Sequence, residues 1–357
     1  MRVHIQYVSG AYLREYEKSY VAEFSREIFS TGGNCEFEMA PIAAEADLII
    51  LWEGFEYKTP NYIALLENEP LIRRHAERVY VINYDDHPEG FLAGVYTSLE
   101  DPFFKPEFHA SWPFYLMNNR RVYDLTSADI NKVVPTRLFS FRGAASHEVR
   151  RKIFELYSGL TSRHLVEHVK KWYDHGDEDR LAFARVALDS MFCLCPHGYS
   201  AYTPRIAEIM AMGRVPVVIA DGWIPFSFPE EIVYYIKVAE ADIPRIPEIL
   251  ESRRSEAAEI GRNARLLWEK YCSPRRRATA VVEAIMRLAR RSGARPTFDD
   301  YRDRWHSREF LRQLGWTWPQ RLGLRVEQHA RRHFPNARIP GVTPLMRYRN
   351  APSMKDG

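Results

Sequence analysis

Short apolar runs alternate with helix-like segments from the first residues of this 357-residue chain. Residues 3–8, 46–54 and 78–86 read as strands, and the segments 13–29 and 61–76 between them read as helices. This strand–helix–strand rhythm is typical of a parallel sheet covered by helices on both faces. The pattern therefore predicts a doubly wound α/β domain.

The same rhythm begins again at residue 138. Strand-like segments at 138–143, 191–195, 214–220 and 233–238 are interspersed with helix-like segments, and helical patterns follow up to residue 291. Residues 117–137 have little apolar period and contain Pro135, so we expect the crossing between two domains there. Because ligands of doubly wound sheets bind at the carboxyl ends of the strands, two such domains would face a central cleft. The expected division is a Rossmann-like domain over 1–130, a second over 131–292, and a C-terminal helical extension over 293–357.

Composition places the chain among ordinary globular proteins, with 46% hydrophobic and 27% charged residues. No apolar stretch approaches the roughly 20 residues of a spanning helix, and the first residues show no signal-peptide pattern. Cys35, Cys193, Cys195 and Cys272 are too few for a disulfide scaffold, and no His or Cys cluster completes a zinc site. We expect a soluble protein of a reducing compartment, most simply the bacterial cytoplasm.

The extension is basic. From Arg290 onward there are 15 Lys and Arg against 6 Asp and Glu, and Trp305, Trp316 and Trp318 lie among them. The favoured interpretation is a helical strap packed back on the first domain. Peripheral contact with an anionic membrane surface or a glycolipid is the alternative. Nucleic acid is not an expected partner, because no recognised binding motif accompanies the charge.

The segment 193–222 carries the most chemistry. A strand ends at Pro196, and a turn leads to a helix expected from about residue 205 to 212, with Thr203 as its N-cap and Pro204 at its first position. The backbone N–H groups of such a helix start attract anions, and Arg205 adds a guanidinium suited to phosphate oxygens. Glu208 lies one turn further on, where it would either accept hydrogen bonds from sugar hydroxyls or face solvent.

This segment resembles the exostosin family, glycosyltransferase family 47. The blocks that carry the resemblance are "CLCPHGY", "TPRIAE" and "GRVPVVIAD", with "LFSFRG" at 138–143, "ADLIILW" at 46–52 and "PF" at 225–226 in the same order. The likeness is strong over about 136–275 and weaker over 1–130. It implies the GT-B fold, with an acceptor domain first and a nucleotide-sugar domain second. It also implies inverting transfer from a nucleotide sugar, usually a UDP-sugar, without an essential metal or cofactor.

The resemblance further implies a donor site. Arg205 and the helix start would hold the diphosphate and Glu208 the ribose, and the turn with Arg142 and Gly143 would approach the phosphates. The full set of candidate donor-binding residues is Arg142, Gly143, His197, Gly198, Tyr199, Ser200, Thr203, Arg205 and Glu208. His197 departs from the family pattern, which often has Arg or Ser there, and this leaves its role open. His147 is either a further donor contact or, the favoured interpretation, a surface histidine on a helix.

An inverting displacement needs a base for the acceptor hydroxyl, and the first domain should supply it. Acidic side chains follow two of its strands. We rank the candidate bases Asp86, Asp85, His87 and Glu53, in that order. A capped acidic turn without catalytic function is the alternative interpretation of this Asp-Asp-His-Pro-Glu-Gly turn.

Other interpretations stay open at this stage. The triplet 177–179 is the only match to an Asp-x-Asp metal motif, and it is better explained as a helix start. Trp223 and Phe226 would contact the donor or belong to the core. A GDP-sugar-dependent, fucosyltransferase-like GT-B enzyme is the rival activity, although its usual Lys is absent near Glu208. A non-catalytic nucleotide- or glycan-binding module is the second rival.

Overall fold

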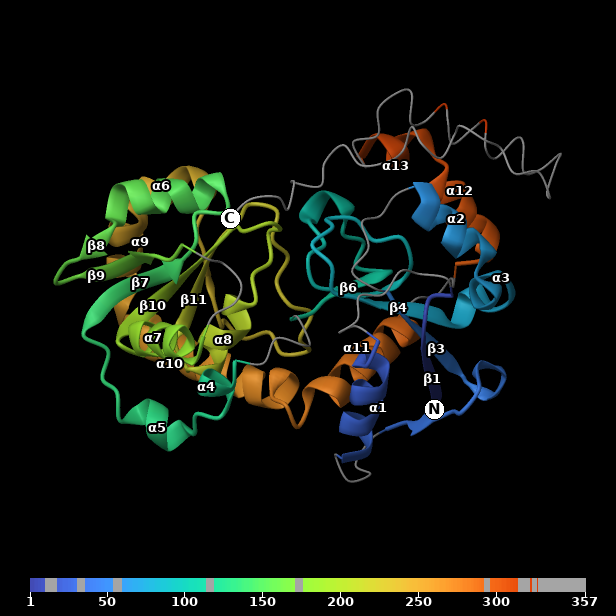
Figure 1. The fold of residues 1–357 in the computed structure, drawn as a ribbon, viewed down its shortest axis with the longest axis horizontal. Coiled ribbons are helices and arrows are strands. Elements are labelled where there is room, and N and C mark those ends of the chain that lie inside the picture. Colours follow the sequence, from blue (N-terminus) through green and yellow to red (C-terminus); the bar gives the residue numbers. More distant parts are fainter. Residues whose placement is uncertain are drawn as a thin grey trace.

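The computed structural model describes residues 1–9, 18–30, 36–53, 60–113, 119–170, 176–291 and 296–313, together with residues 322 and 326. These residues fold into two lobes, each built on a six-stranded sheet (Figure 1). Helices cover the sheets of both lobes, and the strands of each sheet are short.

The first lobe carries an all-parallel sheet with the strand order β2-β1-β3-β4-β5-β6. Three helices join its first four strands. The strands are β1 (Arg2–Tyr7), β2 (Glu38–Met39), β3 (Leu48–Trp52), β4 (Val79–Asn83), β5 (Gly94–Tyr96) and β6 (His109–Ser111), and the helices are α1 (Tyr20–Ser30), α2 (Pro60–Asn68) and α3 (Pro70–His75).

The second lobe carries a sheet with the order β12-β11-β10-β7-β9-β8, in which only the β8–β9 pair is antiparallel. The two lobes are first joined through the short helices α4 (Arg120–Tyr123) and α5 (Ser127–Asn131). The strands are β7 (Arg137–Gly143), β8 (Gly159–Leu160), β9 (His164–His168), β10 (Ser190–Pro196), β11 (Val215–Ile219) and β12 (Ile236–Lys237). The helices are α6 (Glu148–Tyr157), α7 (Asp177–Leu188), α8 (Arg205–Ala211), α9 (Ile246–Ser252) and α10 (Ala257–Leu267).

The inner strands explain why the fold class was readable from the sequence. Every residue of β3, β4 and β11 is buried, as expected of parallel strands that have helices on both faces. Such strands read as continuous apolar runs in the sequence. The predicted class, two doubly wound α/β units of the GT-B type, is confirmed.

The structure departs from the predicted elements in the outer strands of both sheets. The strands β2, β5, β6, β8 and β9 were not predicted, because β2 and β8 have two residues each, β5 and β6 have three, and β9 reads "HLVEH" without alternation. The strand expected over 233–238 is reduced to Ile236–Lys237. The first helix begins, within the described residues, at Tyr20.

The chain returns to the first lobe earlier than expected. Helix α11 (Arg277–Arg291) was predicted as the last helix of the second domain, yet it packs against α1, β5 and β6 of the first lobe (Figure 1). A π-helical turn over Trp268–Cys272 precedes it. Arg277 forms an ion pair with Glu27 of α1, which anchors the start of α11 on its new lobe.

The described part of the extension also lies on the first lobe. Helices α12 (Phe298–Trp305) and α13 (Arg308–Gln313) bury Tyr301, Trp305 and Phe310 in the same apolar cluster as residues of β3 and β4. The Trp305 indole Nε1 donates a hydrogen bond to the Phe91 carbonyl at 2.9 Å. Trp316 and Trp318 lie outside the described residues.

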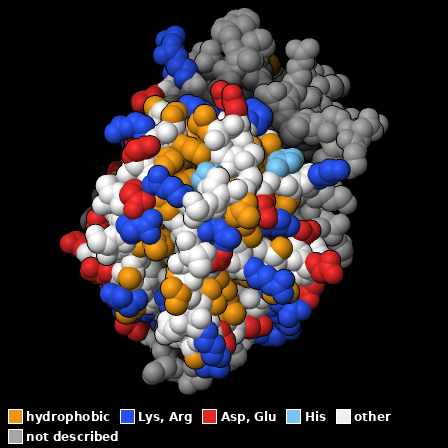
Figure 2. Space-filling model, turned by 90° about the vertical axis from the view of Figure 1, so that its left-hand side faces the viewer, with side chains coloured by type: hydrophobic (Ala, Val, Ile, Leu, Met, Phe, Trp, Pro, Cys, Tyr) orange, Lys and Arg blue, Asp and Glu red, His pale blue; other side chains and the backbone are white. Residues whose placement is uncertain are grey.

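The two lobes share one apolar core cluster. It includes Trp52 and Val95 of the first sheet, Cys195 of the second, and Ile285 of α11. The outer face of the second lobe mixes charged side chains of both signs with small hydrophobic areas (Figure 2). Among the helices that the structure describes, none has the length and apolar character to cross a bilayer.

Candidate functional site between the lobes

The turn that follows β10 is the centre of the candidate site. The backbone N–H of His197 donates to the Ile219 carbonyl at 2.9 Å, and that of Gly198 donates to the Ser200 carbonyl at 3.1 Å. Residues 197–203, called the donor loop below, therefore form a closed turn at the carboxyl ends of β10 and β11. This is the edge at which doubly wound sheets bind ligands.

The expected helix N-cap is wrong by one residue. Pro204 caps α8 with helical angles (φ −54, ψ −24) and no side-chain cap bond, and the Thr203 carbonyl accepts a hydrogen bond from the Ile206 N–H at 3.0 Å. Because proline fixes φ near the helical value, the turn already begins at Pro204. Thr203 is buried at the base of the donor loop.

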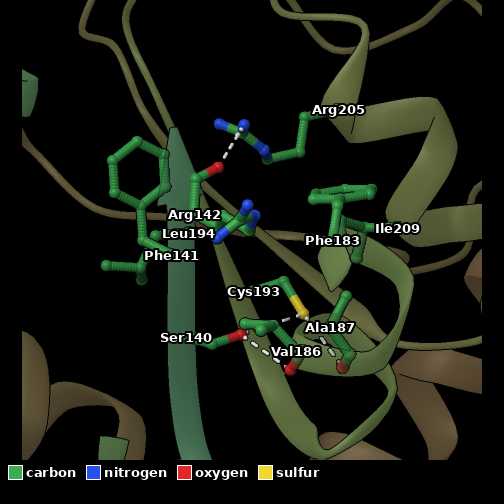
Figure 3. A pocket seen from close by; sticks show the side chains of 10 residues that line it. All are labelled: Ser140, Phe141, Arg142, Phe183, Val186, Ala187, Cys193, Leu194, Arg205 and Ile209. Carbon is green, nitrogen blue, oxygen red and sulfur yellow. Dashed lines mark hydrogen bonds between the residues drawn. The ribbon is translucent and has the colours of Figure 1, made fainter. Parts of the chain in front are cut away.

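The Arg205 guanidinium lies beside the carboxyl end of β7. Its Nη2 donates to the Arg142 carbonyl at 2.6 Å, and its guanidinium lies over the rings of Phe141 (4.9 Å) and Phe183 (5.4 Å) (Figure 3). Its Nε and Nη1 are buried, and neither has a hydrogen-bond partner among the described residues. Burial lowers the pKa of the Arg205 guanidinium. A cavity of about 10 Å³ adjoins it, close to the lower limit for one water molecule.

The Arg142 side chain takes another direction. Its Nη1 donates to Glu167 at 2.7 Å and its Nη2 donates to Asp179 at 2.6 Å. The Arg142 guanidinium is thus paired with two carboxylates, whereas the family resemblance implied that this turn approaches the donor phosphates. Gly143 keeps its expected place: a side chain there would meet Arg205 Nη2 at 3.1 Å.

Arg150 is a residue of this site that the sequence analysis missed. From α6 its Nε donates to the His197 carbonyl at 3.0 Å and its Nη2 donates to the Pro196 carbonyl at 3.3 Å. A side chain at Gly198 would meet Arg150 Nη2 at 2.7 Å, so the glycine permits this close approach. Burial and the charge of Arg205 lower the pKa of Arg150 to about 9. No helical spacing marks Arg150, because only the fold brings α6 under the donor loop.

Two histidines stack at the mouth of the donor loop. The rings of His147 and His197 are 4.1 Å apart and nearly parallel, and His197 Nδ1 lies 3.1 Å from the Glu240 carboxylate. His147 also caps α6 by accepting the Val149 N–H at 3.3 Å. Burial and the neighbouring His197 lower the pKa of His147. The structure thus brings both histidines to the donor side.

Tyr199 and Glu208 lie at the two ends of this segment. Tyr199 is exposed at the tip of the donor loop. Glu208 is half-buried on the first turn of α8, and its charge raises the pKa of Tyr123 after the larger effect of burial. Both positions are compatible with the predicted contacts to a nucleotide.

The acidic turn after β4 rests on a buried polar network. Asn83 Nδ2 donates to Glu53 at 2.6 Å and to Asp85 at 3.0 Å, and the Tyr62 hydroxyl donates to Glu53 at 2.5 Å. Asp85 also accepts the His87 N–H at 2.9 Å. Glu53 and Asp85 are 1% and 4% exposed, which places both of these candidate bases beneath the surface that a substrate could reach.

His87 and Asp86 differ in what they face. His87 Nδ1 contacts the buried carboxylate of Glu89, within the same turn. Asp86 is exposed at the crest of the turn and points across to the second lobe, where its Oδ1 lies 3.1 Å from the Ser200 hydroxyl. Desolvation raises the pKa of Asp86, the Ser200 hydrogen bond lowers it, and the charge of Asp85 raises it. Asp86, the first-ranked base, therefore meets the donor loop.

Glu100 is a second residue that the sequence analysis missed. It follows β5 in the first lobe, forms a bridge with Trp223, and hydrogen-bonds the backbone of Ala201 in the donor loop. A side chain at Gly222 would meet its Oε2 at 2.8 Å. Desolvation raises the pKa of Glu100. An isolated Glu in "SLEDP" gives no sequence signal, since its partners come from the other lobe.

The remaining candidates belong to the core or to ion pairs. Trp223 and Phe226 are 2% and 4% exposed and pack edge to face, so they are core residues. Asp177 forms an ion pair with Arg121 at the start of α7. In the parts of the chain that the structure describes, no group of His, Cys, Asp or Glu could hold a metal ion.

Part of this chain is similar to a known protein family. Residues 91–253 match the model of the Exostosin GT47 domain, which includes β7 through β12. The chain is 29% identical to an exostosin-1 homolog of Caenorhabditis elegans over 248 residues, 58% of this chain and 60% of that protein. It is 45% identical to a probable glucuronoxylan glucuronosyltransferase of Arabidopsis thaliana over 65 residues, 17% of this chain and 14% of that protein. The chain thus spans three fifths or less of the length of these relatives.

Among solved structures, Anabaena Alr3699/HepE in complex with UDP and glucose aligns with a TM-score of 0.39 and 10% identity, covering 80% of this chain and 98% of that one. The family model and the curated relatives point to the same family. Over residues 91–253 this chain is similar to the Exostosin GT47 domain, the family that residues 193–222 resemble.

Proposed function

We propose that this protein is an inverting, metal-independent glycosyltransferase that moves a sugar from a UDP-sugar to a hydroxyl of a glycan or glycolipid. The observation that carries the proposal is the 3.1 Å contact between Asp86 of the first lobe and Ser200 of the donor loop. It joins the one exposed carboxylate of the predicted base turn to the loop of the predicted donor site.

The donor side supplies positive charge for a diphosphate. Arg150 and Arg205 lie on the Phe141 ring at 6.0 and 4.9 Å, and neither forms an ion pair with any described residue. Buried guanidinium groups without carboxylate partners are costly unless an anion joins them. A nucleoside diphosphate would compensate this charge, and Glu208 and Tyr199 lie where ribose or base contacts are expected.

In the proposed reaction, Asp86 accepts the proton of the acceptor hydroxyl as that oxygen attacks the anomeric carbon. The bond between the anomeric carbon and the diphosphate oxygen breaks, and UDP leaves with the electron pair and the negative charge. Arg150 and Arg205 stabilise that charge as it develops. Protonated Asp86 then returns its proton to water. Attack from the side opposite the leaving group inverts the configuration at the anomeric carbon.

The names of the relatives support the reaction class. The plant relatives are named as probable glucuronosyltransferases and a probable β-1,4-xylosyltransferase. A cytoplasmic location and a membrane contact through the basic extension are parts of the proposal that come from the sequence alone. The absence of a metal requirement also comes from the sequence, and it agrees with Arg150 and Arg205 as partners for the diphosphate charge.

A nucleotide screen tests the proposal. Thermal unfolding is followed with UDP, GDP and their sugars, with and without EDTA, since a ligand that binds the folded state raises its stability. We expect stabilisation by UDP and UDP-sugars that EDTA leaves unchanged, and release of UDP when an acceptor glycan is added. Preference for GDP would favour the fucosyltransferase-like rival, and nucleotide binding without turnover would favour a binding module. Loss of activity with EDTA would contradict the metal-free mechanism.

A further inference from the structure

The hydroxyl of Ser200, from the second lobe, contacts the exposed carboxylate of Asp86 on the first lobe. It lies 3.1 Å from Asp86 Oδ1, 3.1 Å from the Ser98 hydroxyl, and 3.2 Å from the Tyr202 carbonyl. Ser200 itself is 2% exposed. If the hydroxyl is removed by substitution, a water molecule therefore has little access to take its position.

A single hydroxyl proton cannot serve all three acceptors at once. While Asp86 is ionised, its carboxylate is the strongest acceptor of the three, since hydrogen bonds to a charged group are stronger than those to a neutral one. Once Asp86 is protonated, the Ser200 proton can turn to the Tyr202 carbonyl, and the new O–H of Asp86 can donate to Ser200. Both states of Asp86 are satisfied without movement of heavy atoms.

The position of Ser200 is fixed by backbone contacts on both sides. Its carbonyl accepts the Gly198 N–H, and the next residue, Ala201, hydrogen-bonds Glu100 of the first lobe. The Ser98 that it contacts follows β5, in the same lobe as Asp86. From its buried place in the donor loop, the Ser200 hydroxyl thus contacts two polar side chains of the first lobe, Asp86 and Ser98.

We propose that Ser200 is a positioning residue for Asp86, which it orients and holds ionised, and is not the donor ligand that the family resemblance implied. This inference rests on the proposed function, because it assigns Asp86 the role of base. It predicts that the donor loop controls the protonation of an acid on the opposite lobe.

The neighbours of Asp86 define the expected pH effect. Desolvation and the Asp85 carboxylate on the same turn raise the pKa of Asp86, and the Ser200 hydrogen bond opposes them. Removal of that bond leaves only the two effects that raise the pKa. The ionised, active form of Asp86 would then require a higher pH, so the acid limb of activity moves upward.

The direct experiment is a pH titration of the Asp86 carboxyl carbon by ¹³C NMR in the full chain, with the signal assigned by its absence in Asp86→Asn. We expect Ser200→Ala to raise the midpoint by about one pH unit, the effect of losing a hydrogen bond to a charged group. Ser200→Thr keeps the hydroxyl and should restore the parent midpoint.

Ser111→Ala is the matched control. Ser111 is also buried, and its hydroxyl also crosses between the lobes, donating to the Ile224 carbonyl at 3.2 Å. It makes no contact with Asp86 among its hydrogen bonds. Its replacement should leave the Asp86 midpoint unchanged.

Isothermal titration with UDP separates this inference from the proposed function. A raised midpoint in Ser200→Ala, with UDP affinity within about twofold of the parent, supports the positioning role. An unchanged midpoint overturns it, and an unchanged midpoint with at least a tenfold loss of UDP affinity makes Ser200 a donor ligand. If the parent chain binds no UDP and releases none from UDP-sugars, the proposed function fails, whatever the midpoint does.

Discussion

Arg205 is the side chain on which the donor site most depends. It donates one hydrogen bond to the Arg142 carbonyl and lies between two aromatic rings, and two of its guanidinium nitrogens have no partner among the described residues. A lysine has the same charge but neither the planar fork nor the stacking surface. A lysine at this position therefore tests the geometry of the Arg205 guanidinium separately from its charge.

Arg205→Lys should lower UDP affinity by about tenfold, because one charged group would lose its fork contacts to the diphosphate. Isothermal titration with UDP measures this. Arg214→Lys is the control, since Arg214 is also largely buried and, among the described residues, bonds the carbonyls of Leu188 and Val133, away from the donor loop. Equal losses in the two variants would mean that the Arg205 effect is structural.

At this scale the sequence predicted some positions and missed others. Asp86 and Arg205 lie at the cleft edge as expected, because one follows a strand end and the other begins a helix after a proline; their roles stay predictions. Arg142 was misread, because its partners Glu167 and Asp179 come from separate elements. Arg150 and Glu100 were missed because their contacts join segments about 50 and 100 residues apart in the chain.

Among the elements, the short strand β5 has the tightest backbone contact. Gly94 pairs with Val81 and has a φ of 156°, and an added Cβ would lie 2.2 Å from the Val81 carbonyl oxygen. Both the backbone angle and the lack of space require glycine there. Long apolar strands such as β3 were readable in the sequence, but β5 exists because β4 and β6 hold it on either side.

Gly94→Ala should therefore destabilise the fold by about 3 kcal/mol, from backbone strain together with overpacking. Denaturant unfolding measures the change in free energy. In Gly176→Ala the new Cβ meets nothing within 4 Å, so this control should cost less than about 1 kcal/mol. Similar values for both variants would contradict the close packing of β5 on β4.

At the scale of the whole molecule, the main feature is the return of the chain from the second lobe to the first. Helix α11 and then α12 and α13 pack on elements near the N-terminus, which local periodicity could not reveal. Helical spacing predicts that a segment is a helix, but the choice of lobe depends on which apolar surface is left uncovered. The ion pair of Arg277 with Glu27 and the burial of Trp305 hold these helices on the first lobe.

Trp305→Ala tests the closure. Trp305 is fully buried, and its loss should destabilise the protein by about 4 kcal/mol through an unfilled cavity and an unpaired Phe91 carbonyl. Phe29→Ala, at a site that is 70% exposed, should cost less than about 0.5 kcal/mol. Unfolding of both variants in denaturant gives the comparison. A Trp305→Ala protein as stable as the parent would show that the extension does not support the first lobe.

The central claim is that a base on the first lobe acts on a donor held by the second, and Asp86→Asn tests it most directly. Rates of UDP release from a UDP-sugar panel with an acceptor glycan are measured beside UDP affinity in the same preparation. We predict a loss of turnover of at least 100-fold, the usual contribution of a general base, with UDP affinity within about twofold of the parent. An Asp86→Asn protein that keeps most of its turnover would contradict the account.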